Sequence, residues 1–172
     1  MKPFNYIAVE TIAEACSFLA GHGTELSILA GGTDLLIELR RGSKKAPKVV
    51  LDISRVGELG GITESDGAIT IGPLVTHAEL VGSAAVRKFA PLLAAAGAAV
   101  GSPQVRARGT VGGNIMNAAA CADTVPALIA LGATVTLESK AGRRELPLAE
   151  LFVKPYQTKA KPEELLTAVS FP

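Results

Sequence analysis

Two short glycine-rich segments carry the residue types in this sequence that are best suited to chemistry. The first glycine loop reads Leu29-Ala30-Gly31-Gly32-Thr33-Asp34-Leu35 and lies between a strand-like and a helix-like run. Glycines allow a ligand to approach the backbone closely, and a helix that begins there offers unpaired N–H groups and a positive dipole end. These features suit a phosphate or pyrophosphate. The alternative is a tight turn in which Thr33 is the helix N-cap.

The second glycine loop reads Arg106-Ala107-Arg108-Gly109-Thr110-Val111-Gly112-Gly113-Asn114-Ile115-Met116-Asn117, with three glycines within five residues. Amides, a hydroxyl and a carboxamide in one loop suit an anionic ligand. The alternative is a loop packed under a sheet edge, with Asn114 satisfying backbone groups. Two such loops in a small chain are more informative than one, because each could hold one part of a long cofactor.

Other patterns associated with nucleotides, catalysis or metals are absent from the sequence. No GxGxxG follows a strand and no GxxxxGKS/T occurs, which excludes a Rossmann dinucleotide site and a P-loop. No GxSxG is present, which excludes the nucleophile elbow of α/β-hydrolases. His22 and His77 are isolated, and Cys16 and Cys121 lie far apart. We therefore predict neither a metal site nor a disulfide framework.

The flanking sequence predicts the elements that must position these loops. Strand patterns over 4–9, 26–30 and 49–53 alternate with helix patterns over 12–19 and 34–41, which predicts a small β-α-β-α-β lobe over residues 1–56. The remainder predicts a larger α+β lobe over residues 57–172. Its expected elements are a hairpin over 62–71, a helical stretch over 76–101 interrupted near Ser83 and Pro91, an irregular segment over 101–120, a helix over 123–131, and strands over 133–138, 143–147 and 165–171.

Length and composition narrow the class of protein. The chain has 172 residues, of which 48% are apolar, with 17 basic and 16 acidic side chains. A chain of this size forms one real core, and its near-neutral charge gives no electrostatic argument for nucleic acid. The longest near-apolar run, 89–101, is too short to span a bilayer. With no signal-peptide pattern at the first residues, we expect a cytoplasmic protein.

Taken together, the motifs resemble the FAD-binding medium subunits of molybdenum hydroxylases, the family of carbon monoxide dehydrogenase and xanthine dehydrogenase. The resemblance rests on residues 30–35, 106–115 and 122–131, and it extends to 71–79 and 164–167, in the same order along the chain. It implies an α+β protein with the two-lobed, PCMH-type FAD-binding fold of the vanillyl-alcohol oxidase superfamily. In that fold the two lobes hold FAD in an extended form.

The resemblance also implies which residues bind FAD, without a covalent link. The amides of residues 30–35 would wrap the pyrophosphate. Asp123 would hold a hydroxyl-bearing part of the cofactor, cap the helix that follows, or do both. The first-loop positions are Leu29, Ala30, Gly31, Gly32, Thr33, Asp34 and Leu35. Those on the opposite side are Thr110, Gly112, Gly113 and Asn114, and those near the flavin or adenine are Gly101, Ser102, Val105, Met116 and Leu166.

Two residues with reactive side chains receive no role in flavin attachment. His77 lies inside the capping box that begins at Thr76, so we expect an exposed histidine at a helix start. Cys121 stands where the family has another small residue, so we expect it to be compact filler. In this family the subunit continues beyond the position of Pro172 into a further α/β domain, which we expect this chain to lack.

The function that the resemblance implies is electron transfer. FAD on this chain would receive electrons from 2Fe–2S clusters on a small iron–sulfur subunit and pass them to an external acceptor. A large subunit with the molybdenum cofactor would carry the substrate chemistry, in a hetero-oligomer without a membrane span. No catalytic side chain and no metal ligand are expected here. The alternatives are a non-catalytic, FAD-less assembly module and a stand-alone flavin reductase of the same superfamily.

Overall fold

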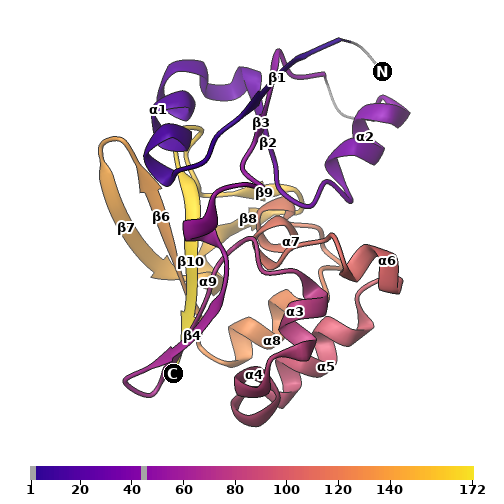
Figure 1. Cartoon of the computed structure of the whole chain (residues 1–172), viewed down its shortest axis with the longest axis vertical. Coiled ribbons are helices and arrows are strands. Elements are labelled where there is room, and N and C mark those ends of the chain that lie inside the picture. Colours follow the sequence, from indigo (N-terminus) through magenta and orange to yellow (C-terminus); the bar gives the residue numbers. More distant parts are fainter. Residues whose placement is uncertain (1–2, 44–45) are drawn as a thin grey trace.

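The computed structural model describes residues 3–43 and 46–172, and its N-terminal part is built on a three-stranded parallel sheet (Figure 1). The strand order is β1-β3-β2, with every neighbouring pair parallel. Helices follow β1 and β2, as the sequence predicts. The elements are β1 (Asn5–Ala8), α1 (Ile12–His22), η1 (Gly23–Glu25), β2 (Leu26–Leu29), α2 (Leu35–Arg41) and β3 (Val49–Asp52).

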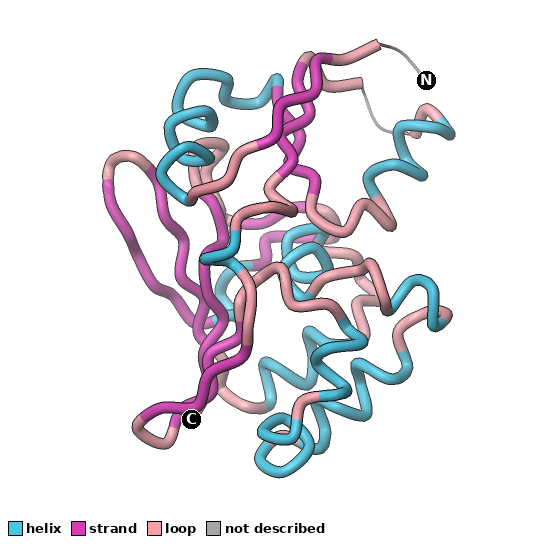
Figure 2. Tube along the Cα trace, in the orientation of Figure 1, coloured by secondary structure: helices cyan, strands magenta, loops and turns pink. Residues whose placement is uncertain are grey.

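The rest of the chain forms a five-stranded antiparallel sheet in the order β4-β5-β10-β6-β7. Most of the helices lie to one side of this sheet (Figure 2). The strands are β4 (Ile62–Ser65), β5 (Ala68–Ile71), β6 (Thr134–Ser139), β7 (Gly142–Pro147) and β10 (Leu165–Phe171), and η2 (Gly57–Leu59) precedes them. The helices are α3 (His77–Gly82), α4 (Ala84–Phe89), α5 (Pro91–Ala99), α6 (Pro103–Arg106), α7 (Val111–Asn117), α8 (Thr124–Ala130) and α9 (Leu148–Leu151).

The prediction of an irregular segment over 101–120 is wrong, because α6 and α7 lie there. Each of these short helices has a side-chain N-cap. Ser102 Oγ accepts from the Val105 amide at 3.3 Å, and Thr110 Oγ1 accepts from the Gly113 amide at 3.0 Å. The caps and the burial of α7 against the core outweigh the low helix propensity of its glycines. The sequence analysis also missed α9 and the small hairpin of β8 (Phe152–Lys154) and β9 (Gln157–Thr158).

Two hydrophobic clusters hold the elements together. The larger lies between the five-stranded sheet and the helices, and it includes Leu80, Ile115, Leu128 and Leu166. The smaller joins α1 and β3 to the turn around Leu59 and to the start of β10. Because α1 also packs against β6 and β10, the N-terminal sheet is attached to the larger one through buried apolar contacts. No helix in the described residues is long and apolar enough to span a membrane.

The sequence has three lysines in the segment after α2: Lys44, Lys45 and Lys48. Lys44 and Lys45 lie outside the described residues. Lys48 forms an ion pair with Glu25 at 2.6 Å, with both side chains more than half exposed. An exposed pair of this kind contributes little to stability.

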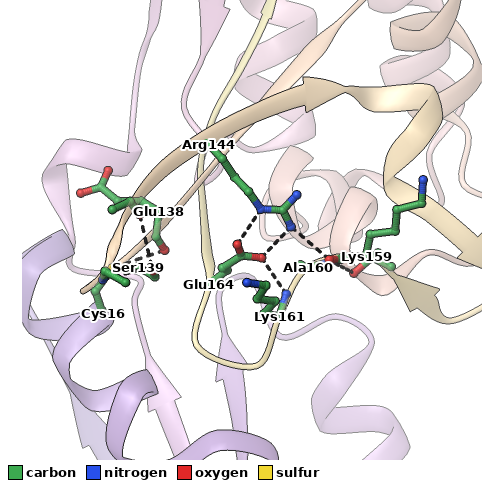
Figure 3. Close-up of polar contacts among 11 residues, drawn as sticks. Cys16, Glu138, Ser139, Arg144, Lys159, Ala160, Lys161 and Glu164 are labelled. Atoms are coloured by element: carbon green, nitrogen blue, oxygen red, sulfur yellow. Dashed lines mark hydrogen bonds and ion pairs between the residues drawn. The ribbon is translucent and has the colours of Figure 1, made fainter.

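A buried carboxylate fixes the loop that leads into β10 (Figure 3). Glu164 is 8% exposed and accepts from Arg144 Nε at 2.6 Å and Nη2 at 2.8 Å, and from the Lys161 amide at 2.7 Å. Arg144 Nη2 also donates to the Lys159 carbonyl. The hydrogen bonds from Arg144 lower the pKa of Glu164 below its ordinary 4.5, and burial opposes them. The pair therefore ties β7 to the segment 159–164.

The lowered pKa of Glu164 predicts a pH-dependent contribution to stability. A carboxyl whose folded-state pKa is depressed stabilises the fold above its unfolded-state pKa, and loses that contribution as pH falls through the folded-state pKa. At pH 7 we expect Glu164→Gln to lower the free energy of unfolding by about 1–2 kcal/mol. The difference between the two proteins should shrink steadily below pH 4.5. Denaturant unfolding at a series of pH values measures it.

The matched control is Glu145→Gln. Glu145 pairs with Arg143 at 2.6 Å, but both side chains are more than half exposed, so this change should cost less than about 1 kcal/mol. If the difference in free energy of unfolding between wild type and Glu164→Gln stays constant from pH 7 to below pH 4.5, the prediction is contradicted, because the carboxylate charge would then contribute nothing to stability.

Candidate functional site

The two glycine loops meet backbone to backbone, although they are far apart in the sequence. The first glycine loop leaves the end of β2 and enters α2, and the second lies below it around α6 and α7 (Figure 1). A Cβ atom at Gly31 would lie 2.0 Å from the carbonyl oxygen of Arg108 and 3.0 Å from Gly109 Cα. Only a glycine allows that approach, so the fold unites the two loops in one site.

The second glycine loop is held by the segment that precedes α3. The Gly112 amide donates to the Pro73 carbonyl at 2.8 Å, the Val111 amide to Val75 at 2.9 Å, and the His77 amide to Gly109 at 3.0 Å. A Cβ at Gly112 would lie 2.5 Å from Pro73 Cβ. The capping box at Thr76 is complete and begins α3 at this same point. Residues 71–79, which take part in the family resemblance, therefore include the backbone groups that hydrogen-bond to the second loop.

The backbone amides of the two loops differ in their availability. In the first glycine loop, the amides of residues 31–35 donate to no acceptor within the described parts of the chain. In the second, the amides of Val111, Gly112, Gly113 and Asn114 all donate to protein oxygens. The first loop can therefore bind an anion through its main chain, whereas the second offers side chains.

Thr33 and Asp123 do not have the capping roles considered as alternatives, and Asp34 makes no cap bond either. Thr33 is not the N-cap of α2, and Asp34, which occupies that position, makes no side-chain cap bond. Asp123 occupies the N-cap position of α8 and likewise makes no cap bond. The carboxylates of Asp34 and Asp123 are exposed, which leaves both available to accept hydrogen bonds from a ligand.

The carboxamide of Asn114 is oriented by a buried hydroxyl. Thr124 is fully buried and donates through Oγ1 to Asn114 Oδ1 at 2.7 Å. This bond occupies the oxygen of Asn114 and leaves its Nδ2 group as a free donor among the described residues. The alternative in which Asn114 satisfies backbone groups is not observed.

The remaining predicted residues fall into two groups. Gly101 (φ +43°), Ser102 and Val105 surround the start of α6, where the Arg106 guanidinium binds the carbonyls of residues 100 and 101 at 2.9 and 3.0 Å. Met116 packs against the larger core cluster, and Leu166, 3% exposed on β10, belongs to it. The first group lies beside the second glycine loop, because the Gly109 amide donates to the Val105 carbonyl.

The prediction that His77 is exposed is wrong, because its side chain is 2% exposed. Cys121, expected to be compact filler, has an exposed side chain. Burial lowers the pKa of His77, and of the nearby charges Asp123 raises it, Arg106 lowers it and Asp34 raises it. A capping box marks where a helix begins but does not say which of its residues face the protein. The sequence signal therefore missed a buried histidine beside both loops.

Fold and site together define a class: an α+β domain in which two glycine loops meet, one of them with free amides that suit a phosphate-bearing ligand. Comparison with known proteins specifies that class. The sequence model described as "FAD binding domain in molybdopterin dehydrogenase" matches residues 2–172, and the chain belongs to this family. Its α+β structure is therefore the PCMH-type FAD-binding fold that the sequence predicts.

Several relatives are similar over the whole chain. The 6-hydroxypseudooxynicotine dehydrogenase complex subunit alpha of Paenarthrobacter nicotinovorans is 38% identical over 174 residues, covering 100% of this chain and 58% of that protein. The carbon monoxide dehydrogenase medium chain of Hydrogenophaga pseudoflava is 34% identical over 169 residues, covering 98% of this chain and 58% of that protein. A solved structure of carbon monoxide dehydrogenase from Hydrogenophaga pseudoflava superposes with a TM-score of 0.96 at 34% identity. The match covers 100% of this chain and 60% of that one. The chain thus spans about three fifths of these relatives' length.

Proposed function

We propose that this chain binds FAD non-covalently between its two glycine loops and forms the flavin-binding part of a molybdenum hydroxylase's medium subunit. The observation that carries the proposal is the row of amides at residues 31–35 with no acceptor among the described residues, beside a second loop in backbone contact. Adjacent free amides at a strand-to-helix turn fit a pyrophosphate. Membership of the FAD-binding family supports the same assignment.

The proposed roles of the site residues follow from the groups that each leaves free. Residues 29–35 bind the pyrophosphate, mainly through main-chain amides. Asn114 Nδ2 donates from the opposite side, where Thr110, Gly112 and Gly113 shape the surface, and the Asp123 carboxylate accepts from a cofactor hydroxyl. The residues proposed to lie near the flavin or adenine are Gly101, Ser102, Val105, Met116 and Leu166.

When bound, FAD supplies the redox chemistry, accepting electrons from iron–sulfur clusters and passing them to an external carrier. The residues of this chain bind and orient the cofactor, and none is proposed as an acid or a base. The relatives are named as subunits or chains of dehydrogenases. We therefore propose a large molybdenum subunit and a small 2Fe–2S subunit as partners, in a cytoplasmic hetero-oligomer. We further propose lobes over residues 1–56 and 57–172, each contributing one glycine loop.

The proposal is tested by purifying the intact protein and recording its absorption spectrum, with and without added FAD. We expect the visible and near-ultraviolet bands of oxidised flavin, and release of FAD on denaturation, since no covalent link is proposed. A colourless protein that takes up no added FAD would contradict the proposal and favour an assembly module. Copurification with molybdenum and iron–sulfur subunits separates the proposed role from that of a stand-alone flavin reductase.

A further inference from the structure

His77 is a buried imidazole whose hydrogen-bonding capacity is unused. It is the first residue of α3, and its side chain is 2% exposed. Its Nδ1 atom is fully enclosed and has no hydrogen-bond partner, and its Nε2 atom makes no hydrogen bond within residues 3–43 and 46–172. Buried polar groups in proteins are normally paired, so this side chain is unusual among the described residues.

The enclosed Nδ1 indicates which tautomer the ring adopts. A neutral imidazole carries one N–H donor and one lone-pair acceptor. A buried N–H group without an acceptor is rarer in proteins than a buried acceptor without a donor. The proton therefore belongs on Nε2, which makes Nε2–H a donor. The lowered pKa of His77, caused mainly by burial, agrees with a neutral ring.

The same ring edge faces the meeting point of the two glycine loops. The position that a Cβ would take on Gly109 lies 3.3 Å from His77 Cδ2 and 3.4 Å from Thr33 Oγ1. Cδ2 is bonded to Nε2 in the imidazole ring. The edge of the His77 ring that carries Nε2 and Cδ2 is thus the edge that meets Gly109, and the Thr33 hydroxyl of the first loop approaches the same point.

The charged groups around His77 come from the elements that form the site. Asp123 precedes α8, Arg106 ends α6, and Asp34 precedes α2, and all three are close enough to influence its pKa. Helix α5, which packs on α3, contains no titratable side chain. Neither carboxylate accepts a hydrogen bond from the ring, so the Nε2–H group remains available for a ligand.

We propose that His77 is a cofactor-binding residue whose Nε2–H group donates a hydrogen bond to the pyrophosphate of FAD where the two glycine loops meet. The inference rests on the proposed FAD site and adds to it a residue from α3. It gives the Nε2–H group of this buried histidine a partner, while Nδ1 stays enclosed as an unpaired acceptor. The bond joins the first and second glycine loops and α3 to the same anion.

The test compares three substitutions in the intact protein, with affinities measured by calorimetry. His77→Gln keeps a donor near the Nε2 position, His77→Asn keeps one only near Nδ1, and His77→Phe keeps the ring without a donor. The probes are FAD, ADP, which retains the pyrophosphate, and riboflavin, which lacks phosphate. We expect His77→Phe and His77→Asn to bind FAD and ADP roughly 10- to 100-fold more weakly. His77→Gln should stay within a few-fold of wild type, and riboflavin affinity should not change.

The outcomes distinguish this inference from the proposed function. A wild-type protein that binds neither FAD nor ADP overturns both. Wild-type binding together with an unchanged His77→Phe protein overturns the role of His77 alone. An equal loss of FAD, ADP and riboflavin in all three variants, with lowered thermal stability, also overturns it, because that pattern reports a structural residue. If His77→Asn binds FAD and ADP as tightly as wild type while His77→Gln does not, the role of Nε2 is also overturned.

A second readout is independent of affinity. In the ligand-free protein, ¹⁵N NMR of the imidazole should show His77 neutral and protonated at Nε2. Addition of ADP should shift the Nε2 resonance and leave the fully enclosed Nδ1 less affected. A ring protonated at Nδ1, or an Nε2 resonance that does not respond to saturating ADP, would overturn the inference.

Discussion

Gly31→Ala should weaken FAD binding by about 10- to 100-fold and lower the free energy of unfolding by about 1–3 kcal/mol. The reason is steric: the added methyl carbon would lie 2.0 Å from the Arg108 carbonyl oxygen, which is main chain and cannot rotate away. The two loops must then separate, and the amides of residues 31–35 lose their place opposite the second loop. Calorimetry with FAD and denaturant unfolding measure the two effects.

Gly21→Ala is the matched control for this change. Gly21 lies within α1, and a Cβ there would meet nothing within 4 Å. The same substitution should leave FAD binding unchanged and raise stability by about 0.5–1 kcal/mol, because alanine is the better helix residue. If Gly31→Ala binds FAD as tightly as Gly21→Ala, the backbone contact between the loops is not required for the site.

Ile115→Ala should lower the free energy of unfolding by about 2–5 kcal/mol, the largest stability effect that we predict. Ile115 is fully buried in the larger core cluster and belongs to α7. Its removal leaves a cavity beneath the helix that carries Gly112, Gly113 and Asn114. We expect FAD affinity to fall as well, since α7 positions the side chain of Asn114. Chemical denaturation gives the stability and FAD titration the affinity.

Ile129→Ala removes the same atoms from the neighbouring helix α8 and serves as the control. Ile129 is 39% exposed, so its truncation should cost about 1 kcal/mol or less. Comparable losses for the two variants would mean that α7 is not anchored by Ile115 and that the larger core does not support the second glycine loop.

Much of the secondary structure could be predicted because its signals are local. The final strand over 165–171, the hairpin of β4 and β5, and the capping box at Thr76 all occur where the sequence places them. At Thr11 the cap is present, but the Glu14 carboxylate accepts from the amide of Glu10 rather than from that of Thr11. Among the elements that were missed, α6 and α7 are helices of four and seven residues, too short for local propensity to decide, so that caps and packing decide.

The candidate site divides in the same way. The sequence by itself determined that two glycine loops exist, that the first adjoins a helix start, and that their pattern resembles an FAD-binding family, because residue type and spacing carry that information. Only the tertiary structure decided that Gly31 meets Arg108, that the first loop keeps its amides free while the second does not, and that His77 is buried beside both. Those facts depend on contacts between segments far apart in the chain, and no local pattern specifies how such segments pack.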